Sequence, residues 1–344
     1  MVFGSNQKIT YIMKTAFLTE MGFWGLTTPE NTNLRTEFAW MCALQSYHFN
    51  IHNYERVEGF DVVFVIFPKA TVKLNAVGSE MTTSGIDKDI SIYSKPIIQT
   101  LKKNNTLVCN VQEGPSWFFN EYDMPTQFNF YNQLAECDIL FAHNEYDTHF
   151  YKGLFPQTKV AVIPSLMITK NLLPSEMYNK EDKVIIGGNF ARWYGGFQSY
   201  IVATEFDCPI YAPTSHCKRK GEEQVPCLHH LPWVMWNDWI KQLSTFKYAV
   251  NLMPTIAAGT FSMNCGYFGI PCIGNEKVDT QTQLFPELSV DVNDIHTARY
   301  MAIQLKEDKD FYEHTSHYAK KSATNSLYCN VDKWLDYMNG VING

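Results

Sequence analysis

The stretch VNLMPTIAAGTFSMNCGYFGIPCIGNEKVDTQTQLFPEL, residues 250–288, decides the fold. Its pattern predicts a buried strand at Tyr248–Met253, a Gly-Thr-Phe-Ser turn, a short helix, Gly-Ile-Pro, a second short strand at Cys272 and Ile273, and a polar loop. A helix that begins near Thr260 presents unpaired backbone N–H groups and the positive end of its dipole, and both suit a phosphate group. The stretch therefore predicts an α/β unit with an anion-binding turn.

The bulk properties are those of a packed, two-domain protein. The chain has 344 residues, of which 45% are hydrophobic and 15% aromatic. That length exceeds one ordinary core, and that composition excludes a disordered chain. We find no apolar run long enough for a transmembrane helix and no signal-peptide pattern at the N-terminus, so we expect a cytoplasmic protein without membrane insertion.

Charge and cysteine content exclude further classes. The net charge of -7 argues against nucleic-acid binding over the whole surface. The compact basic cluster Lys218–Lys220 is followed by acidic residues and is interpreted as a solvated loop. Nine scattered cysteines do not predict a disulfide scaffold. Cys217, Cys227, His229 and His230 lack the spacing of a zinc site, so we predict no metal.

Strand-like and helix-like patterns alternate along the chain, which favours parallel sheets. We expect a first domain at 1–172, a second at 183–325, and a closing amphipathic helix within 326–344. The predicted strands are 9–17, 62–67, 106–111, 139–142, 160–163, 184–186, 210–211 and 248–253, and the predicted helices are 34–47 (capped by Asn33), 94–103, 128–136, 196–205, 236–244, 296–305 and 331–341. The fold class is therefore α/β, with two Rossmann-like halves and a cleft between them.

Because ligands of open parallel sheets bind at the carboxyl ends of strands, the loops after strands are the candidate sites. Gly187-Gly188-Asn189-Phe190-Ala191-Arg192 follows a predicted strand directly. Its glycines allow close approach of a ligand, and Arg192 suits a diphosphate through paired hydrogen bonds. The alternative is a tight turn with no ligand.

This loop and two further segments, 228–232 and 250–288, resemble a known family. The strand and loop VIIGGNFARWYGG, residues 184–196, is similar to the corresponding segment of phage DNA β-glucosyltransferases, and Leu228-His229-His230-Leu231-Pro232 resembles their base-binding turn. With the strand, turn, helix and Gly-x-Pro of residues 250–288, the chain resembles GT-B glycosyltransferases. The resemblance implies a GT-B fold, a nucleotide-sugar donor (a UDP-sugar first), no cofactor, and metal-independent transfer. It places the base at His230 and Leu231 and the donor phosphates at Gly259, Thr260, Phe261 and Ser262.

The same resemblance implies a catalytic carboxylate at Glu113. The segment Leu107–Pro115 is similar to the family's strand that ends in a catalytic aspartate, and Glu113 falls at or beside that position. Sugar transfer with inversion needs one carboxylate to deprotonate the acceptor hydroxyl. The alternative is an exposed loop glutamate.

The chain departs from the family at two positions where a carboxylate is expected. The family places a glutamate that grips the ribose on the helix before Gly-x-Pro, and here that position holds Asn264. Asparagine still donates and accepts hydrogen bonds, but it carries no charge. The second motif carboxylate of the retaining enzymes would fall at Ile256, so the stereochemical outcome stays open.

Other strand-end residues are weaker candidates. Asp279 and Thr280 either contact the donor or form an Asp-initiated turn. His143 either binds the sugar or acceptor or is a structural histidine. Contacts to the sugar or acceptor are further expected from four residues: Gly22, Trp24, Gly25 and Trp193.

Three functions stay open. The first is transfer of a sugar to a 5-hydroxymethylated pyrimidine in phage DNA, in the host cytoplasm; such a base must be flipped out of the duplex. The second is transfer to a surface or lipid-linked glycan. The third is a nucleotide- or sugar-binding protein without catalysis. We make no prediction of the oligomeric state.

Overall fold

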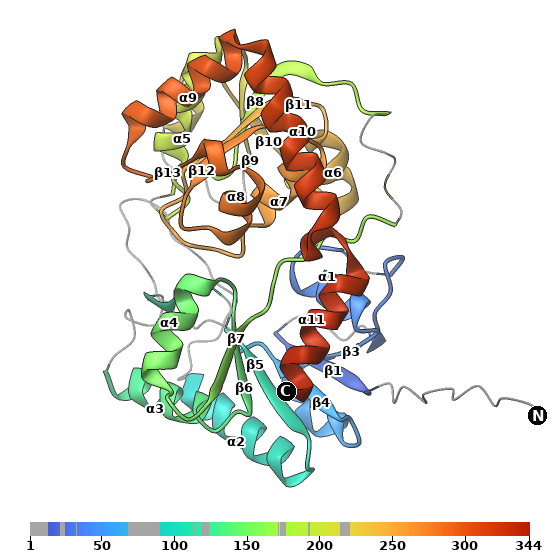
Figure 1. Cartoon of the computed structure of the whole chain (residues 1–344). Coiled ribbons are helices and arrows are strands. Elements are labelled where there is room, and N and C mark those ends of the chain that lie inside the picture. The colour runs from blue at the N-terminus through green and yellow to red at the C-terminus, as the bar shows by residue number, and fades with distance from the viewer. Residues whose placement is uncertain are drawn as a thin grey trace, which may run out of the picture.

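Two parallel sheets, one in each half of the chain, form the frame of the molecule (Figure 1). The computed structural model describes residues 13–20, 25–31, 33–67, 90–112, 114–117, 124–170, 172, 177–191, 193–213 and 221–344. Figure 1 shows the second sheet above the first, with helices packed around each. The predicted fold class, two Rossmann-like units with a helical C-terminus, is confirmed. The boundaries at 172, 183 and 325 stay a prediction.

The first sheet has seven strands in the order β2-β3-β1-β4-β5-β6-β7, and all neighbours are parallel except β2 and β3. Its elements are β1 (Thr15–Thr19), β2 (Gly25–Leu26), α1 (Glu37–Ala43), β3 (Tyr47–Asn50), β4 (Val62–Val65), α2 (Ile90–Lys103), β5 (Leu107–Val111), α3 (Met124–Leu134), β6 (Ile139–Ala142), α4 (Glu145–Leu154) and β7 (Lys159–Val162).

The central strands of this sheet are buried on both faces, which is why they read as continuous apolar runs. In β1, Phe17 packs into one apolar core, whereas Ala16 and Leu18 pack into the other. Phe17 stacks on Phe64 of the neighbouring strand β4, with ring centroids 4.6 Å apart. One core lies under α2 and α3, and the other is shared with the second half of the chain.

The second sheet has the strand order β10-β9-β8-β11-β12-β13, all parallel. Its elements are β8 (Glu181–Ile186), α5 (Gly196–Ala203), β9 (Ile210–Pro213), β10 (Leu228–Leu231), α6 (Trp236–Leu243), β11 (Phe246–Asn251), α7 (Thr260–Tyr267), β12 (Cys272–Asn275), α8 (Asp279–Leu284), β13 (Ser289–Val290), α9 (Ile295–Glu307) and α10 (Lys309–Asn325). Counted from β8, this is the 3-2-1-4-5-6 order of the Rossmann fold.

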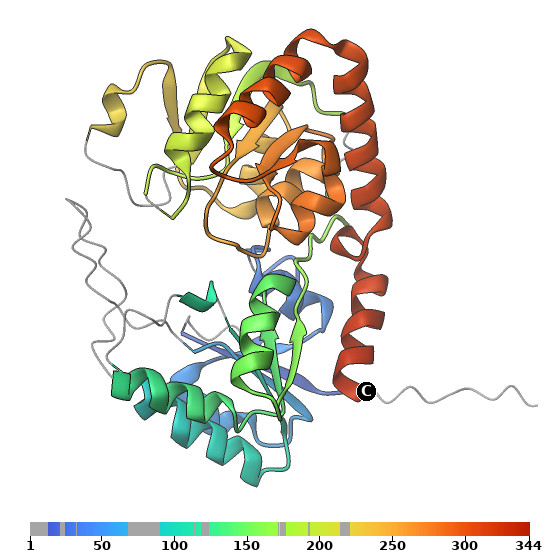
Figure 2. The same ribbon diagram turned by 60° about the vertical axis from the view of Figure 1, so that its left-hand side comes forward.

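The last helix, α11 (Val331–Asn343), leaves the second half and packs on the first. Figure 2 shows α10 and α11 as one column along the side of the molecule. The indole N–H groups of Trp334 in α11 and Trp40 in α1 both donate to the carbonyl of Pro164, each at 2.9 Å. Tyr337 donates to the carbonyl of Val162 at 3.0 Å. The predicted closing helix is therefore confirmed, and it fastens the end of the chain to β7 and its exit.

The predicted helix 34–47 is wrong in its length. Helix α1 ends at Ala43, and Gln45 then adopts a left-handed backbone with φ 50°. The N–H of Ser46 bonds back to the carbonyl of Met41, which closes the helix end. The chain then enters strand β3, which periodicity alone did not separate from the helix. The prediction of a polar loop after the strand at Cys272 and Ile273 is also wrong, because this segment contains helix α8.

Each half supplies a side chain that caps a helix of the other half. Asn33 does not cap α1; its Oδ1 accepts from the N–H of Trp236, the first residue of α6, at 2.8 Å. In the opposite direction, Oδ2 of Asp279 accepts from the N–H of Glu145, the first residue of α4, at 2.9 Å. Because free N–H groups at a helix start need acceptors, these reciprocal caps tie the halves together. None of the helices described here is long and apolar enough to cross a membrane.

Candidate functional site between the two sheets

The strand order of the second sheet reverses between β8 and β11, and this switch point is where ligands of such sheets bind. Gly187 follows β8, and its N–H donates to the carbonyl of Val250 in β11 at 2.8 Å. A Cβ on Gly187 would lie 2.5 Å from the side chain of Asn251, the last residue of β11. The switch point therefore consists of Gly187 and Asn251 packed side by side.

The loop after Gly187 is folded tightly on itself. A Cβ on Gly188 would lie 2.7 Å from Cβ of Tyr194. The side chain of Asn189 is fully buried, and its Oδ1 accepts from the N–H of Ala191 at 3.0 Å. The packing of the chain itself therefore requires both glycines. This agrees with a tight turn, the alternative to a ligand-binding loop. Trp193 is partly buried, and its ring centroid lies 6.2 Å from that of Tyr194; Arg192 lies outside the described residues.

The predicted turn before α7 forms where the sequence placed it. Helix α7 begins at Thr260, and Gly259 before it has φ +75°. Thr260 and Phe261, the first residues of the helix, are partly exposed and lie at its positive end. The phosphate contact expected at this end of α7 stays a prediction.

Ser262 and Asn264, two other predicted contacts on α7, lie deeper. Ser262 is buried and donates to Oε1 of Gln281 at 2.8 Å. Asn264 is 2% exposed, and its Oδ1 has no hydrogen-bond partner among the described residues. Ser262 is thereby engaged inside the second half, whereas Asn264 keeps an unused acceptor.

The segment predicted to hold the base is the end of strand β10. Nε2 of His230 lies 2.9 Å from Oε1 of the buried Glu222, so its side chain is engaged within the protein. Leu231 ends the strand and is partly buried. Among the strands that the structure describes, β10 lies at the edge of the second sheet and pairs with β9.

The remaining candidates in the first half are dispersed. Gly25 opens the short edge strand β2, with φ 70°. His143 follows β6, is 8% exposed, and packs against Trp40 with ring centroids 5.5 Å apart. Glu113, Gly22 and Trp24 lie outside the described residues.

A cavity of about 310 Å³ brings together strand ends of both sheets. Its lining includes Ser116 and Trp117, which follow β5, together with Lys277 after β12 and Asp291 after β13. Sequence reasoning missed Lys277 and Asp291, although both follow strands at the carboxyl end, the position that signals a binding loop. Lys277 is exposed and brings a positive charge to the described lining, at the end of β12.

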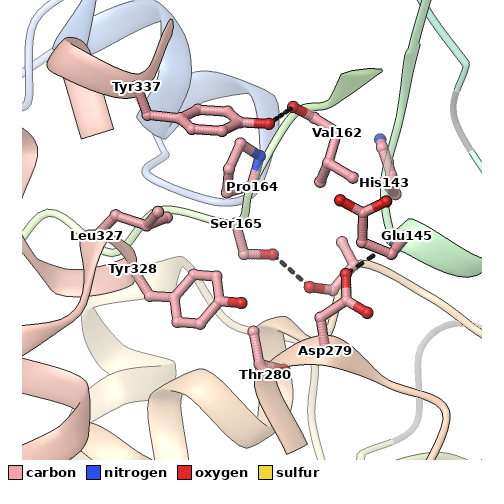
Figure 3. A pocket seen from close by; sticks show the side chains of 11 residues that line it. His143, Glu145, Val162, Pro164, Ser165, Asp279, Thr280, Leu327, Tyr328 and Tyr337 are labelled. Atoms are coloured by element: carbon pink, nitrogen blue, oxygen red, sulfur yellow. Dashed lines mark hydrogen bonds between the residues drawn. The ribbon is translucent and has the colours of Figure 1, made fainter. Parts of the chain in front are cut away.

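A second cavity, of about 190 Å³, collects three of the predicted residues: His143, Asp279 and Thr280 (Figure 3). The hydroxyl of Thr280 donates to the carbonyl of Gly259 at 2.8 Å, and that of Ser165 donates to the carbonyl of Ala258 at 2.6 Å. Asp279 caps α4 as described. These groups therefore hold the two halves and the start of α7 in place.

Burial raises the pKa of the Asp279 carboxyl. The N–H of Glu145 opposes that rise, whereas the carboxylates of Glu145 and Asp147 add to it. The site therefore concentrates negative charge between the halves.

We compared the chain with known protein families, curated proteins and solved structures. No family model and no curated protein matches the chain. Solved structures do match: an alpha-glucosyltransferase in complex with UDP and a 13-mer DNA containing an HMU base has a TM-score of 0.63 at 10% identity, over 96% of this chain and 99% of that one.

Two further structures match over similar lengths. Sucrose-phosphate synthase from Thermosynechococcus elongatus has a TM-score of 0.63 at 8% identity, over 96% of this chain and 98% of that one. HepE from Anabaena, in complex with UDP and glucose, has a TM-score of 0.62 at 10% identity, over 96% of this chain and 99% of that one. At such identities these likenesses show the fold, which is GT-B.

Proposed function

We propose that this chain, which has the GT-B fold, is a glycosyltransferase that moves a sugar from a nucleotide donor to an acceptor hydroxyl. The observation that carries the proposal is the switch point of the second sheet, where Gly187 after β8 and Asn251 at the end of β11 pack side by side. The similar structures hold UDP or UDP and glucose, which supports a UDP-sugar as the donor.

In this proposal the donor lies on the second half. The diphosphate binds the N–H groups at Thr260 and Phe261, with Arg192 as the neutralising cation. The base lies against the backbone of His230 and Leu231, and the unused acceptor of Asn264 is the group proposed for the ribose. Lys277 adds charge near the leaving group.

The chemistry requires a base on the first half. We assign it to Glu113 on the sequence resemblance; its neighbours Val111 and Pro115 lie at the end of β5 and on the larger cavity. Its carboxylate takes the proton of the acceptor hydroxyl while the oxygen attacks the anomeric carbon, and the nucleoside diphosphate leaves. The dipole of α7 and the cations Arg192 and Lys277 stabilise the negative charge on the departing nucleoside diphosphate. A single displacement of this kind inverts the anomeric carbon.

For the acceptor we propose a 5-hydroxymethylated pyrimidine in DNA. Support comes from the neighbour that holds DNA with an HMU base. The alternative is a surface or lipid-linked glycan, and the net charge of -7 favours it, because DNA phosphates attract basic surfaces. Experiment decides between the two acceptors.

The test is nucleotide release by the purified protein from UDP-, GDP-, ADP- and CMP-sugars, with and without DNA that contains 5-hydroxymethylcytosine. Release stimulated by this DNA, with a matching mass gain on the base, establishes the DNA acceptor. Release that the DNA does not affect keeps the transferase and directs the search to glycans. Donor binding without release favours a binding protein, and the absence of both overturns the proposal.

The role of Glu113 is tested separately by Glu113→Gln. We expect turnover to fall about a hundredfold or more while donor affinity stays unchanged. The matched control is Glu58→Gln. Glu58 lies in an exposed turn, so this change should leave turnover as it is. Equal activity of both variants would remove Glu113 from the mechanism.

A further inference from the structure

One buried side chain joins the two walls of the larger cavity, the one of about 310 Å³. Asn144, the N-cap of α4, is 1% exposed. Its Nδ2 donates to the carbonyl of Ile256 at 3.2 Å and to Oδ2 of Asp147 at 3.1 Å. Ile256 belongs to the second half and Asp147 to the first, and both line the cavity. A single amide group therefore contacts a residue of each wall.

The partners of Asn144 determine how its side chain is oriented. Its Oδ1 accepts from the N–H of Asp147 at 2.7 Å, which caps the start of α4. A backbone N–H can only donate and a carbonyl can only accept, so these partners leave one orientation of the amide. Its Nδ2 carries two protons, and the two bonds described use both. Because Asn144 is buried, water does not replace a bond that Ile256 or Asp147 loses by moving away.

The carboxylate of Asp147 extends this connection within the first half. Asp147 is 2% exposed, and its Oδ1 accepts from the N–H of Ser116 at 3.3 Å. Burial raises the pKa of this carboxyl, and the hydrogen bonds from Ser116 and Asn144 oppose the rise. Since one carboxylate oxygen serves each partner, the bonds form a continuous chain through Ile256, Asn144, Asp147 and Ser116.

The two ends of this chain of bonds, which we call the cross-cavity network, lie on segments with different proposed tasks. Ile256 lies between β11 and α7, so it precedes the helix start at Thr260 that is proposed to hold the donor diphosphate. Ser116 follows β5 in the first half, which is proposed to hold the acceptor. The network therefore leads from the donor side of the cavity to the acceptor side.

We propose that Asn144 is a positioning residue, which passes the ordering of the donor segment on to the acceptor segment. Nucleotide binding at the start of α7 restrains residues 254–259, and the cross-cavity network then restrains Ser116 and the residues beside it. Coupling of this kind is reciprocal, so an acceptor held beside Ser116 strengthens nucleotide binding by the same factor. The inference rests on the proposed donor site, and it does not depend on which acceptor is used.

The test is hydrogen–deuterium exchange of the full chain, with and without saturating UDP. Exchange at an amide reports how often its hydrogen bond opens, and the N–H of Ser116 is itself a member of the network. In the wild type, UDP should slow exchange at residues 260–262 and also at Ser116 and Trp117, each about fivefold or more. The quantity compared between proteins is this UDP-dependent slowing, because a change in packing alone alters exchange equally with and without UDP.

Asn144→Ser removes the network and keeps the cap of α4. Serine caps helices about as well as asparagine, but its single hydroxyl cannot replace the Nδ2 group. UDP should then slow exchange at residues 260–262 as in the wild type, and the slowing at Ser116 and Trp117 should be lost. Asp147→Asn is the second variant. An amide has one oxygen, which serves Asn144 or Ser116 but not both, so the same loss is expected.

The matched control is Asn330→Ser, the same change at the N-cap of α11. Oδ1 of Asn330 accepts from the N–H of Lys333 at 3.0 Å, and Asn330 is not among the described residues that line the cavity. This variant should keep both UDP effects. Slowing at residues 260–262 alone in the wild type, or undiminished slowing at Ser116 in Asn144→Ser and Asp147→Asn, overturns the inference and leaves the transferase proposal standing. No slowing at either segment overturns the donor site and this inference together.

Discussion

Gly259 shows how a single residue fixes the start of α7. Its φ of +75° belongs to the left-handed region, and a Cβ there would lie 1.9 Å from Oγ1 of Thr280. The same Thr280 hydroxyl donates to the carbonyl of Gly259. A glycine is required here by both backbone conformation and space. The sequence predicted the turn correctly, but the partner that makes the glycine necessary lies 21 positions away and left no signal.

Gly259→Ala should therefore lower the free energy of unfolding by about 2 to 4 kcal/mol, through strain at positive φ and overlap with Thr280. Gly340→Ala is the control: Gly340 lies inside α11, and nothing lies within 4 Å of its added Cβ. That change should stabilise by about 0.5 to 1 kcal/mol. Urea unfolding measures both. Equal stability of the two variants would contradict the packing of α8 on α7.

His48 in β3 makes the stability of the first half depend on pH. The side chain is fully buried, and burial lowers its pKa from 6.5 to about 4. The folded protein therefore keeps His48 neutral where the unfolded chain takes up a proton. Because the unfolded state binds more protons between these values, the free energy of unfolding decreases as the pH falls from 6.5 toward 4.

Lowering the pH from 7 to 5.5 should lower the free energy of unfolding by about 1 kcal/mol through this histidine. His48→Gln should lose that part of the pH dependence, although it also loses the bond to Oγ1 of Thr19. His296→Gln, at an exposed position, should keep the dependence of the wild type. Denaturant unfolding at both pH values provides the comparison, and identical slopes for all three proteins would exclude a buried neutral His48.

At the scale of elements, the local sequence pattern predicted the strands and helices whose position depends on nearby residues. The buried strands β4 and β6 and helix α6 lie where their apolar periodicity placed them. The errors fall where distant contacts decide. Asn33 has the chemistry of a cap and was assigned to the next helix, yet its acceptor serves α6, 203 positions away. Asp279 stays a predicted ligand contact, and nothing in the sequence indicated that its carboxylate also caps α4 of the other half.

Helix α11 depends on one buried tryptophan. Trp334→Ala should lower the free energy of unfolding by about 3 to 5 kcal/mol, because it empties a fully buried position. Trp334→Phe should lower it by only about 1 kcal/mol, since the Pro164 carbonyl keeps its bond from Trp40. Thermal or urea unfolding of both variants tests this. If Trp334→Phe were as damaging as Trp334→Ala, the shared acceptor would not be protecting the helix.

At the scale of the molecule, the two halves are joined by short polar contacts on several sides. Arg35 donates to the carbonyl of Val234 at 2.8 Å and lies 5.4 Å from the ring of Trp233. Asn144 donates to the carbonyl of Ile256 at 3.2 Å. Such contacts fix the relative position of the sheets, and with it the cavities where their strand ends meet.

Replacing Asn33 and Arg35 together by alanine should release one side of this junction. We expect faster hydrogen exchange at the start of α6 and a loss of about 1 to 3 kcal/mol of stability, from one cap and one bond to a charged group. Asn104→Ala, in an exposed turn of the first half, is the control. Exchange that rises evenly over the whole chain, and not at residues 236–239, would argue against a local junction.

The path of α11 also sets an order in time. Residues 331–343 complete the surface around Pro164, but a ribosome makes them about 170 residues later than that proline. While the second half is being synthesised, the first half leaves Trp40 and the exit of β7 without the aromatic cover that Trp334 and Tyr337 provide. During synthesis, this face therefore stays uncovered until the last helix has been made. A stop codon before residue 331 would leave that face open permanently.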